Sequence, residues 1–158
     1  MIHIRTSIYD EDTLALIRND ATVSLATSAN INKVGNKFAP SSLTDILVYP
    51  FANFLCSHWY AAYFEHKTPV YPHTDNDSPG MYIIGIIPLI WDDILPPSTI
   101  VHNKTADTKI ILQQKNTLPD LVTFTWTKNS ALFFAHNMFH SSGPYTGTKT
   151  GIQLIGWR

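Results

Sequence analysis

The fold is decided between residues 58 and 91, where HWYAAYFEH (58–66) and MYIIGIIPLIW (81–91) enclose the polar stretch KTPVYPHTDNDSPG (67–80). Both apolar runs are rich in β-branched and aromatic residues, which favour strands. Short strands at regular intervals are typical of an antiparallel sandwich, jelly roll or barrel. Similar runs recur after turn residues at STIVHN (98–103), TKIILQQ (108–114), LVTFTW (121–126), SALFFAH (130–136) and TGIQLIGW (150–157).

The segment before this region has a different pattern. Residues 7–19 predict a short helix that Ser7 or Asp10 can cap. Residues 20–41 are polar and predict a loop with a strand near 22–26. We therefore expect helical and loop structure to precede the strands.

The next segment, SSLTDILVYPFANFL (41–55), is compatible with a second helix that Ser42 caps, but its Pro50 leaves the assignment open. We expect a mainly β (α+β) chain with one or two N-terminal helices. At 158 residues it is most simply one domain, 1–158, with a helical and loop part at 1–55 and a β core at 56–158.

Composition and charge argue against several classes of partner. A formal net charge of −1 gives no electrostatic reason to expect a nucleic acid or an anionic membrane. No apolar stretch reaches the roughly 18 residues needed to cross a bilayer. The single cysteine, Cys56, and an N-terminus without an apolar segment favour a reducing cytoplasm.

The polar stretch contains His73-Thr74-Asp75, which places an imidazole and a carboxylate on one face of an extended segment. A metal ion held there needs a third ligand. Of the chain's seven histidines, His140 is the best candidate, because it ends an apolar run and precedes a turn and the last predicted strand. His136, near the end of the same run, is the alternative. Two histidines and one carboxylate suit Fe(II) that also binds a co-substrate and dioxygen.

These residues also stand in a recognisable order: His-x-Asp, then His140 after 65 residues, then Pro144, Gly147 and Lys149. This order resembles the Fe(II)/2-oxoglutarate-dependent oxygenase superfamily, most closely its prolyl-hydroxylase-like branch, over residues 56–158. The resemblance implies a double-stranded β-helix, or jelly roll, in the cupin-like class.

The resemblance also implies roles for particular residues. His73, Asp75 and His140 would be the catalytic iron ligands. Lys149 would pair with the distal carboxylate of 2-oxoglutarate, with Arg158 as the other candidate cation. Tyr63, ten residues before His73, matches a tyrosine that hydrogen-bonds the co-substrate in related enzymes.

The function implied is a dioxygenase that uses Fe(II), 2-oxoglutarate and O2 to hydroxylate a peptidyl or small-molecule substrate, with release of succinate and CO2. A carboxylate at position 75 favours hydroxylation, because related halogenases carry a small residue there. Two alternatives stay open: a cupin-type metal-binding jelly roll that does not use 2-oxoglutarate, and a non-catalytic binding module. The sequence does not define the substrate or the oligomeric state.

Overall fold

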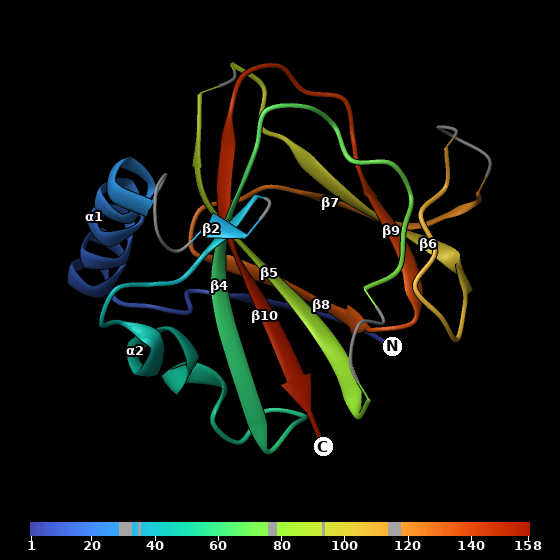
Figure 1. Cartoon of the computed structure of the whole chain (residues 1–158), viewed down its shortest axis with the longest axis horizontal. Coiled ribbons are helices and arrows are strands. Elements are labelled where there is room, and N and C mark those ends of the chain that lie inside the picture. The colour runs from blue at the N-terminus through green and yellow to red at the C-terminus, as the bar shows by residue number, and fades with distance from the viewer. Residues whose placement is uncertain (29–32, 35, 76–78, 93, 114–117) are drawn as a thin grey trace.

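The computed structural model describes residues 1–28, 33–34, 36–75, 79–92, 94–113 and 118–158, and it consists mainly of two antiparallel β-sheets (Figure 1). The helices are α1 (Glu11–Ser28) and α2 (Thr44–Val48), and α2 continues into a 3-10 turn, η1 (Tyr49–Phe51). The strands are β1 (Ile2–Thr6), β2 (Lys33–Val34), β3 (Lys37–Phe38), β4 (His58–His66), β5 (Met81–Trp91), β6 (Ser98–Thr105), β7 (Asp120–Thr125), β8 (Ser130–Ala135), β9 (Met138–Ser142) and β10 (Lys149–Trp157).

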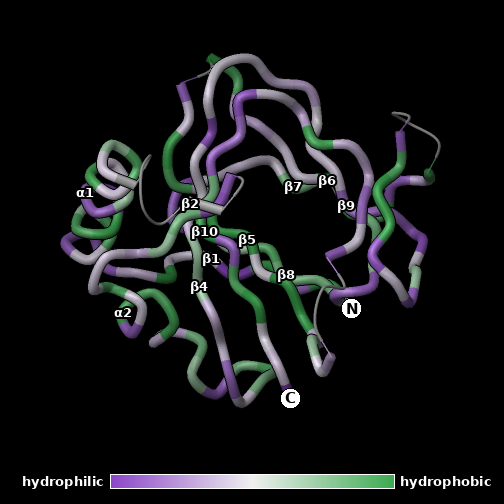
Figure 2. Tube along the Cα trace, in the orientation of Figure 1, coloured by the Kyte–Doolittle hydropathy of each residue, from purple (hydrophilic) through white to green (hydrophobic). Residues whose placement is uncertain are grey.

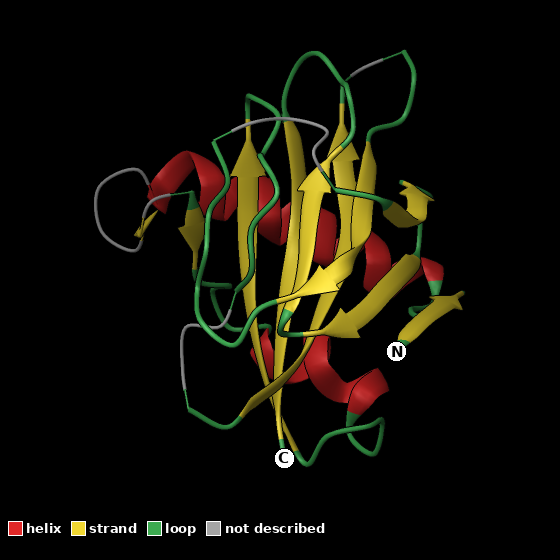
Figure 3. Cartoon of the chain, turned by 90° about the vertical axis from the view of Figure 1, so that its right-hand side faces the viewer, coloured by secondary structure: helices red, strands yellow, loops and turns green. Residues whose placement is uncertain are grey.

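The larger sheet has the strand order β1-β8-β5-β10-β4-β3-β2, and the smaller sheet has the order β7-β6-β9. Their strands pair antiparallel throughout. Figure 3 shows the helices on one side of the larger sheet. This arrangement confirms the predicted mainly β fold with N-terminal helices, a double-stranded β-helix.

Both faces of the larger sheet are covered, which explains its long apolar runs. Ile83, Ile87 and Leu154 face the helices, whereas Ile84 and Ile86 face the smaller sheet. Figure 2 shows hydrophobic residues gathered along β5 and β8. A strand buried on both faces needs no alternation of polar and apolar residues.

Helix α1 corrects the prediction for the segment that follows its first turns. The helix extends to Ser28, so the strand predicted near residues 22–26 is wrong, as is the loop up to residue 28. The rest of the predicted loop, to residue 41, contains β2 and β3, and residues 29–32 and 35 lie outside the described residues. Ile17, Ala21 and Ser24 are buried at helical spacing and keep one face of the helix in contact with the core. Packing of this face outweighs the polar composition that predicted a loop.

The first helix begins after Asp10, one of its two predicted caps, whereas the start of the second helix differs from the prediction. Asp10 caps α1, because its carboxylate accepts a hydrogen bond from the Thr13 backbone amide at 2.7 Å. The second helix begins at Thr44, so Leu43 and not the predicted Ser42 occupies its cap position. Leu43 precedes it without a side-chain cap and is buried, so packing rather than capping fixes this start.

Two predicted strand assignments change as well. The sequence did not indicate β1, which finds its partner only in β8, more than 120 residues further along the chain. Conversely, the run 108–113 forms no strand in the described residues, apart from an isolated bridge between Ile111 and His73; residue 114 lies outside them. Neither helix of the described chain combines the length and hydropathy that a bilayer crossing requires.

Candidate metal centre

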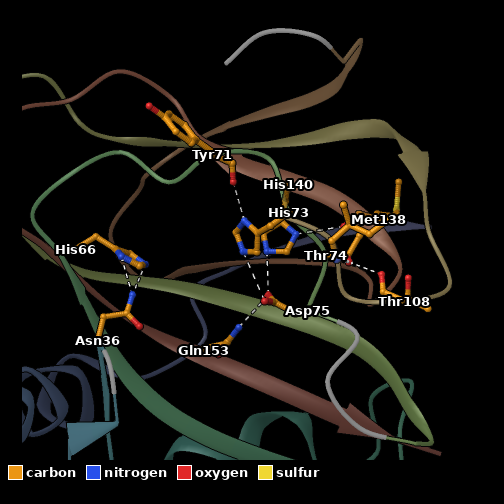
Figure 4. Close-up of polar contacts among 11 residues, drawn as sticks. Asn36, His66, Tyr71, His73, Thr74, Asp75, Thr108, Met138, His140 and Gln153 are labelled. Atoms are coloured by element: carbon orange, nitrogen blue, oxygen red, sulfur yellow. Dashed lines mark hydrogen bonds and ion pairs between the residues drawn. The ribbon is translucent and has the colours of Figure 1, made fainter. Parts of the chain in front are cut away.

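His73 and His140 are brought together by backbone pairing between distant segments. They form an isolated antiparallel bridge, in which each backbone amide donates to the other's carbonyl oxygen at 3.0 Å. His140 lies on β9, and His73 lies on the segment between β4 and β5. The long stretch of chain between them therefore folds back to place two imidazoles side by side, with ring centroids 4.2 Å apart (Figure 4).

Thr74 fixes the orientation of its two neighbours. Its hydroxyl donates to the Thr108 carbonyl at 2.9 Å and accepts from the Ile110 amide at 3.0 Å. Because alternate residues of an extended segment point to opposite sides, this attachment turns His73 and Asp75 toward the interior.

The three side chains converge on one point. The His140 Nε2 lies 2.9 Å from one carboxylate oxygen of Asp75, and the His73 Nε2 lies 3.5 Å from the other. The three potential ligand atoms all lie within 4.8 Å of one another. Figure 4 shows both rings directed at the Asp75 carboxylate.

The hydrogen bonds of the two imidazole rings hold a proton on each Nδ1 and direct each Nε2 toward the centre of the cluster. The His73 Nδ1 lies 2.8 Å from the Tyr71 carbonyl oxygen, and the His140 Nδ1 lies 3.2 Å from that of Met138. A carbonyl oxygen can only accept, so each Nδ1 carries a proton, and Nε2 is the atom of each ring that a metal ion would bind, in place of the contact with Asp75. Such backbone contacts are the usual support of metal-bound histidines. The residues therefore fit a divalent ion that accepts two imidazoles and a carboxylate.

Electrostatics favour a neutral His73 and an ionised Asp75. Burial, with help from nearby His140, lowers the pKa of His73 to about 4, so its imidazole is neutral near pH 7. Burial alone would raise the pKa of Asp75, but the charge of and hydrogen bond from His140, together with His73, lower it below the usual range. Gln153 on β10 donates to the Asp75 carboxylate at 3.2 Å and helps to orient it.

A cavity of about 270 Å³ opens onto this cluster, and Lys149 forms part of its wall. The Lys149 side chain is 2% exposed, and its ammonium donates to the Ser142 hydroxyl at 2.9 Å. It also lies 4.5 Å from the Tyr145 ring and 5.0 Å from that of Trp126, within cation–π range. Burial lowers its pKa to about 8. In the described residues no carboxylate pairs with it, so this ammonium can bind an anionic ligand.

The structure decides two alternatives that the sequence left open. His136 does not join the cluster; its Nδ1 lies 3.0 Å from the Tyr82 carbonyl oxygen. Arg158 lies at the opposite end of β10 from Lys149 and stacks on the Tyr82 ring at 3.8 Å. It is His140 and Lys149 that line the cavity.

Tyr63 requires a correction, because its side chain lies on the other face of β4. It is fully buried in the core beneath the helices, and its hydroxyl donates to Asp20 on α1 at 2.7 Å. Its neighbour Phe64 lines the cavity instead. Side chains alternate along a strand, so a correct assignment needed the register of β4, which sequence spacing alone does not supply.

Sequence reasoning missed several cavity residues. Gln153 could have been found, since it follows Lys149 by four residues on the same strand and so shares its face. Trp126 and His66, which no motif in the sequence singled out, also line the cavity. So does Lys37, whose position depends on the pairing of β3 with β4 and leaves no signal in the sequence.

No family model and no curated protein matches this sequence. Solved structures, in contrast, match nearly the whole chain. One is the non-heme alpha ketoglutarate dependent epimerase SnoN from nogalamycin biosynthesis, with 13% identity and a TM-score of 0.70 over 98% of this chain and 76% of that one. Another is a prolyl-4-hydroxylase from Pseudomonas putida, with 9% identity and a TM-score of 0.66 over 99% and 92%. A third, EctD from S. alaskensis with 2-oxoglutarate and 5-hydroxyectoine, has 15% identity and a TM-score of 0.69 over 98% and 71%.

The fold is therefore that of the Fe(II)/2-oxoglutarate-dependent oxygenases, as the resemblance in sequence predicted. Identities of 9–15% concern the fold and leave the reaction of this chain open. This chain has a His-Asp-His cluster of its own, and the cluster lines the same cavity as the buried Lys149.

Proposed function

We propose that this protein is an Fe(II)- and 2-oxoglutarate-dependent dioxygenase that hydroxylates a small-molecule or peptidyl substrate and releases succinate and CO2. The observation that carries the proposal is the pairing of two sites in one cavity. One is the cluster of His73, Asp75 and His140, and the other is the buried Lys149 ammonium.

Each of these residues has a defined part in the proposal. The Nε2 atoms of His73 and His140 and the carboxylate of Asp75 would hold Fe(II). The Lys149 ammonium would bind the distal carboxylate of 2-oxoglutarate, which is a charge-assisted contact in a poorly hydrated place. When bound, iron, 2-oxoglutarate and dioxygen would supply the oxidative decarboxylation and the oxidation of a substrate C–H bond.

The residues of the chain itself would position the metal and 2-oxoglutarate and would exclude water from them. The carbonyls of Tyr71 and Met138 hold a proton on the Nδ1 of each histidine and so keep both Nε2 atoms available. Phe64 and Trp126 supply apolar wall beside the Lys149 amine. An apolar wall strengthens the attraction between that amine and a carboxylate, because it lowers the local dielectric.

Anaerobic titration of the purified protein with Fe(II) and 2-oxoglutarate tests the proposal. We expect the weak visible absorption of an iron–2-oxoglutarate complex, and succinate after admission of air. His73→Ala should abolish both, whereas His58→Ala, which changes an exposed histidine outside the cluster, should leave both intact. Absence of the absorption and of succinate from the wild-type protein would refute the proposal.

Lys149→Ala separates this function from that of a metal-binding jelly roll without 2-oxoglutarate. Under the proposal the variant still binds metal but loses 2-oxoglutarate and succinate formation. If Lys149→Ala leaves a metal-dependent activity unchanged, the protein does not use 2-oxoglutarate through this residue. Metal analysis by mass spectrometry addresses the remaining alternative, since a non-catalytic module would hold no stoichiometric metal.

A further inference from the structure

Lys37 brings a second ammonium group to the cavity from β3, which lies between β4 and the edge strand β2 in the larger sheet. β3 pairs with β4 so that Lys37 lies opposite Phe64 and Phe38 lies opposite Tyr63. Paired residues share a face of the sheet. Phe38 and Tyr63 are buried beneath the helices, so Lys37 faces the cavity together with Phe64.

Lys37, His66 and Lys149 all line this cavity. His66, which pairs in register with Lys149, accepts a hydrogen bond from the Asn36 side-chain amide at 2.8 Å and lines the cavity beside it. Burial lowers the pKa of His66 to about 4, and the charges of Lys149 and Lys37 add to this effect. Lys37 also contributes to the lowered pKa of Asp75, so its ammonium acts on the cluster as well as on His66.

The side-chain ammonium of Lys37 has no ion pair or hydrogen bond within the described part of the chain. Among the described lining residues, Asp75 supplies the cavity's carboxylate, and the proposed iron site uses it. Lys149 is likewise assigned to 2-oxoglutarate. Lys109 also lines the cavity but already has an interaction of its own.

We propose that Lys37 selects a primary substrate that carries a carboxylate, and that this substrate is a small organic acid. The inference rests on the proposed function, because it assigns the iron ligands and Lys149 to other tasks. A cavity of about 270 Å³ is at the small end of ligand sites and suits a free acid. An ammonium without a partner beside the reacting centre favours an anion over a neutral or cationic molecule.

The test uses pairs of ligands that differ in charge but not in size. A panel of short aliphatic and aromatic carboxylic acids, each matched with its primary amide, is titrated by calorimetry into protein saturated with Mn(II) and N-oxalylglycine. We expect at least one acid to bind about tenfold more tightly than its amide, as a partly exposed charged contact allows. Lys37→Gln should abolish this preference, and Lys37→Arg should restore it.

Lys128→Gln is the matched control, because it removes the same charge from an exposed turn outside the cavity. The inference is overturned if no acid binds more tightly than its amide. It is also overturned if Lys128→Gln reduces the preference as much as Lys37→Gln, or if acidic peptides bind and free acids do not. Succinate formation by the wild-type protein without primary substrate reports on the proposed function separately, so either idea can fail alone.

Discussion

Replacement of Lys149 by methionine should make the metal-free protein more stable while it removes 2-oxoglutarate binding. The Lys149 amine has a pKa of about 8 in the folded chain against an ordinary 10.5. At about 1.4 kcal/mol for each pH unit, burial of the charged amine costs about 3 kcal/mol near neutral pH. Methionine has a similar length and carries no charge, so it avoids this cost.

The expected gain in the free energy of unfolding is reduced by the contacts that the Lys149 amine makes in the folded chain. Lys149 lies over the Trp126 and Tyr145 rings and donates to Ser142. Cation–π contacts contribute about 0.5–2 kcal/mol. We therefore expect a net increase of about 1–3 kcal/mol in the free energy of unfolding at pH 7. Loss of the charge-assisted contact should raise the Kd for 2-oxoglutarate about 100-fold.

Urea denaturation from pH 7 to pH 10.5 measures the effect. Between pH 8 and 10.5 the unfolded state binds more protons at this amine than the folded state does, so stability rises with pH there. The cost of burying the charged Lys149 amine is complete below about pH 8 and disappears as the pH approaches 10.5. The difference in stability between wild type and Lys149→Met should therefore shrink over this range, and other groups that titrate there cancel in the difference.

Lys128→Met is the control, since the same change at an exposed position should alter stability by less than about 0.5 kcal/mol. A methionine variant that is clearly less stable than wild type at pH 7 would refute the reasoning. So would a difference in stability that stays constant from pH 8 to 10.5.

Three further predictions concern the surroundings of the site. Tyr63→Phe removes the hydrogen bond to Asp20 and should cost about 1–2 kcal/mol in urea denaturation, with the Kd for 2-oxoglutarate unchanged. Gln153→Met removes a donor to Asp75 and should weaken Fe(II) binding about tenfold or more in competition titrations. The stability difference between the metal-free wild-type protein and His66→Gln should change by about 2 kcal/mol in urea denaturation as the pH drops from 6.5 to 4, because only the wild-type chain must keep His66 neutral to stay folded.

Each of these predictions has a contrary result. Weaker 2-oxoglutarate binding in Tyr63→Phe would restore the role that the sequence suggested for this tyrosine. Unchanged iron affinity in Gln153→Met would show that its contact with Asp75 is incidental. His66→Gln should flatten the acid-side loss of stability, and an equally steep loss in this variant would assign it to other groups.

Much of the fold could be predicted from local patterns. The apolar runs of β4, β5 and β10 identified strands, because a strand buried on both faces requires β-branched and aromatic residues along its length. The helix α1 was predicted but cut short, since its second half is polar in composition and depends on a buried stripe. The edge strand β1 left no signal at all, because its partner lies near the other end of the chain.

The candidate site divides in the same way. The spacing of His73 and Asp75 placed both on one side of an extended segment, and the residues after His140 made it the stronger third candidate. The sequence could not predict on which face of β4 Tyr63 lies, because a shift of one residue in register exchanges the two faces. The same is true of Lys37, which reaches the cavity only through β3.

The sequence by itself thus determined the strands and the order of the candidate ligands, which depend on residue type and short spacing. The tertiary structure decided what depends on distant segments: the bridge between His73 and His140, the face of each strand that meets the cavity, and the burial of Lys149. Burial is a property of everything packed around a group. The pKa of the Lys149 amine is therefore lowered only when both sheets close around it, and only then can the buried amine bind an anion in the cavity.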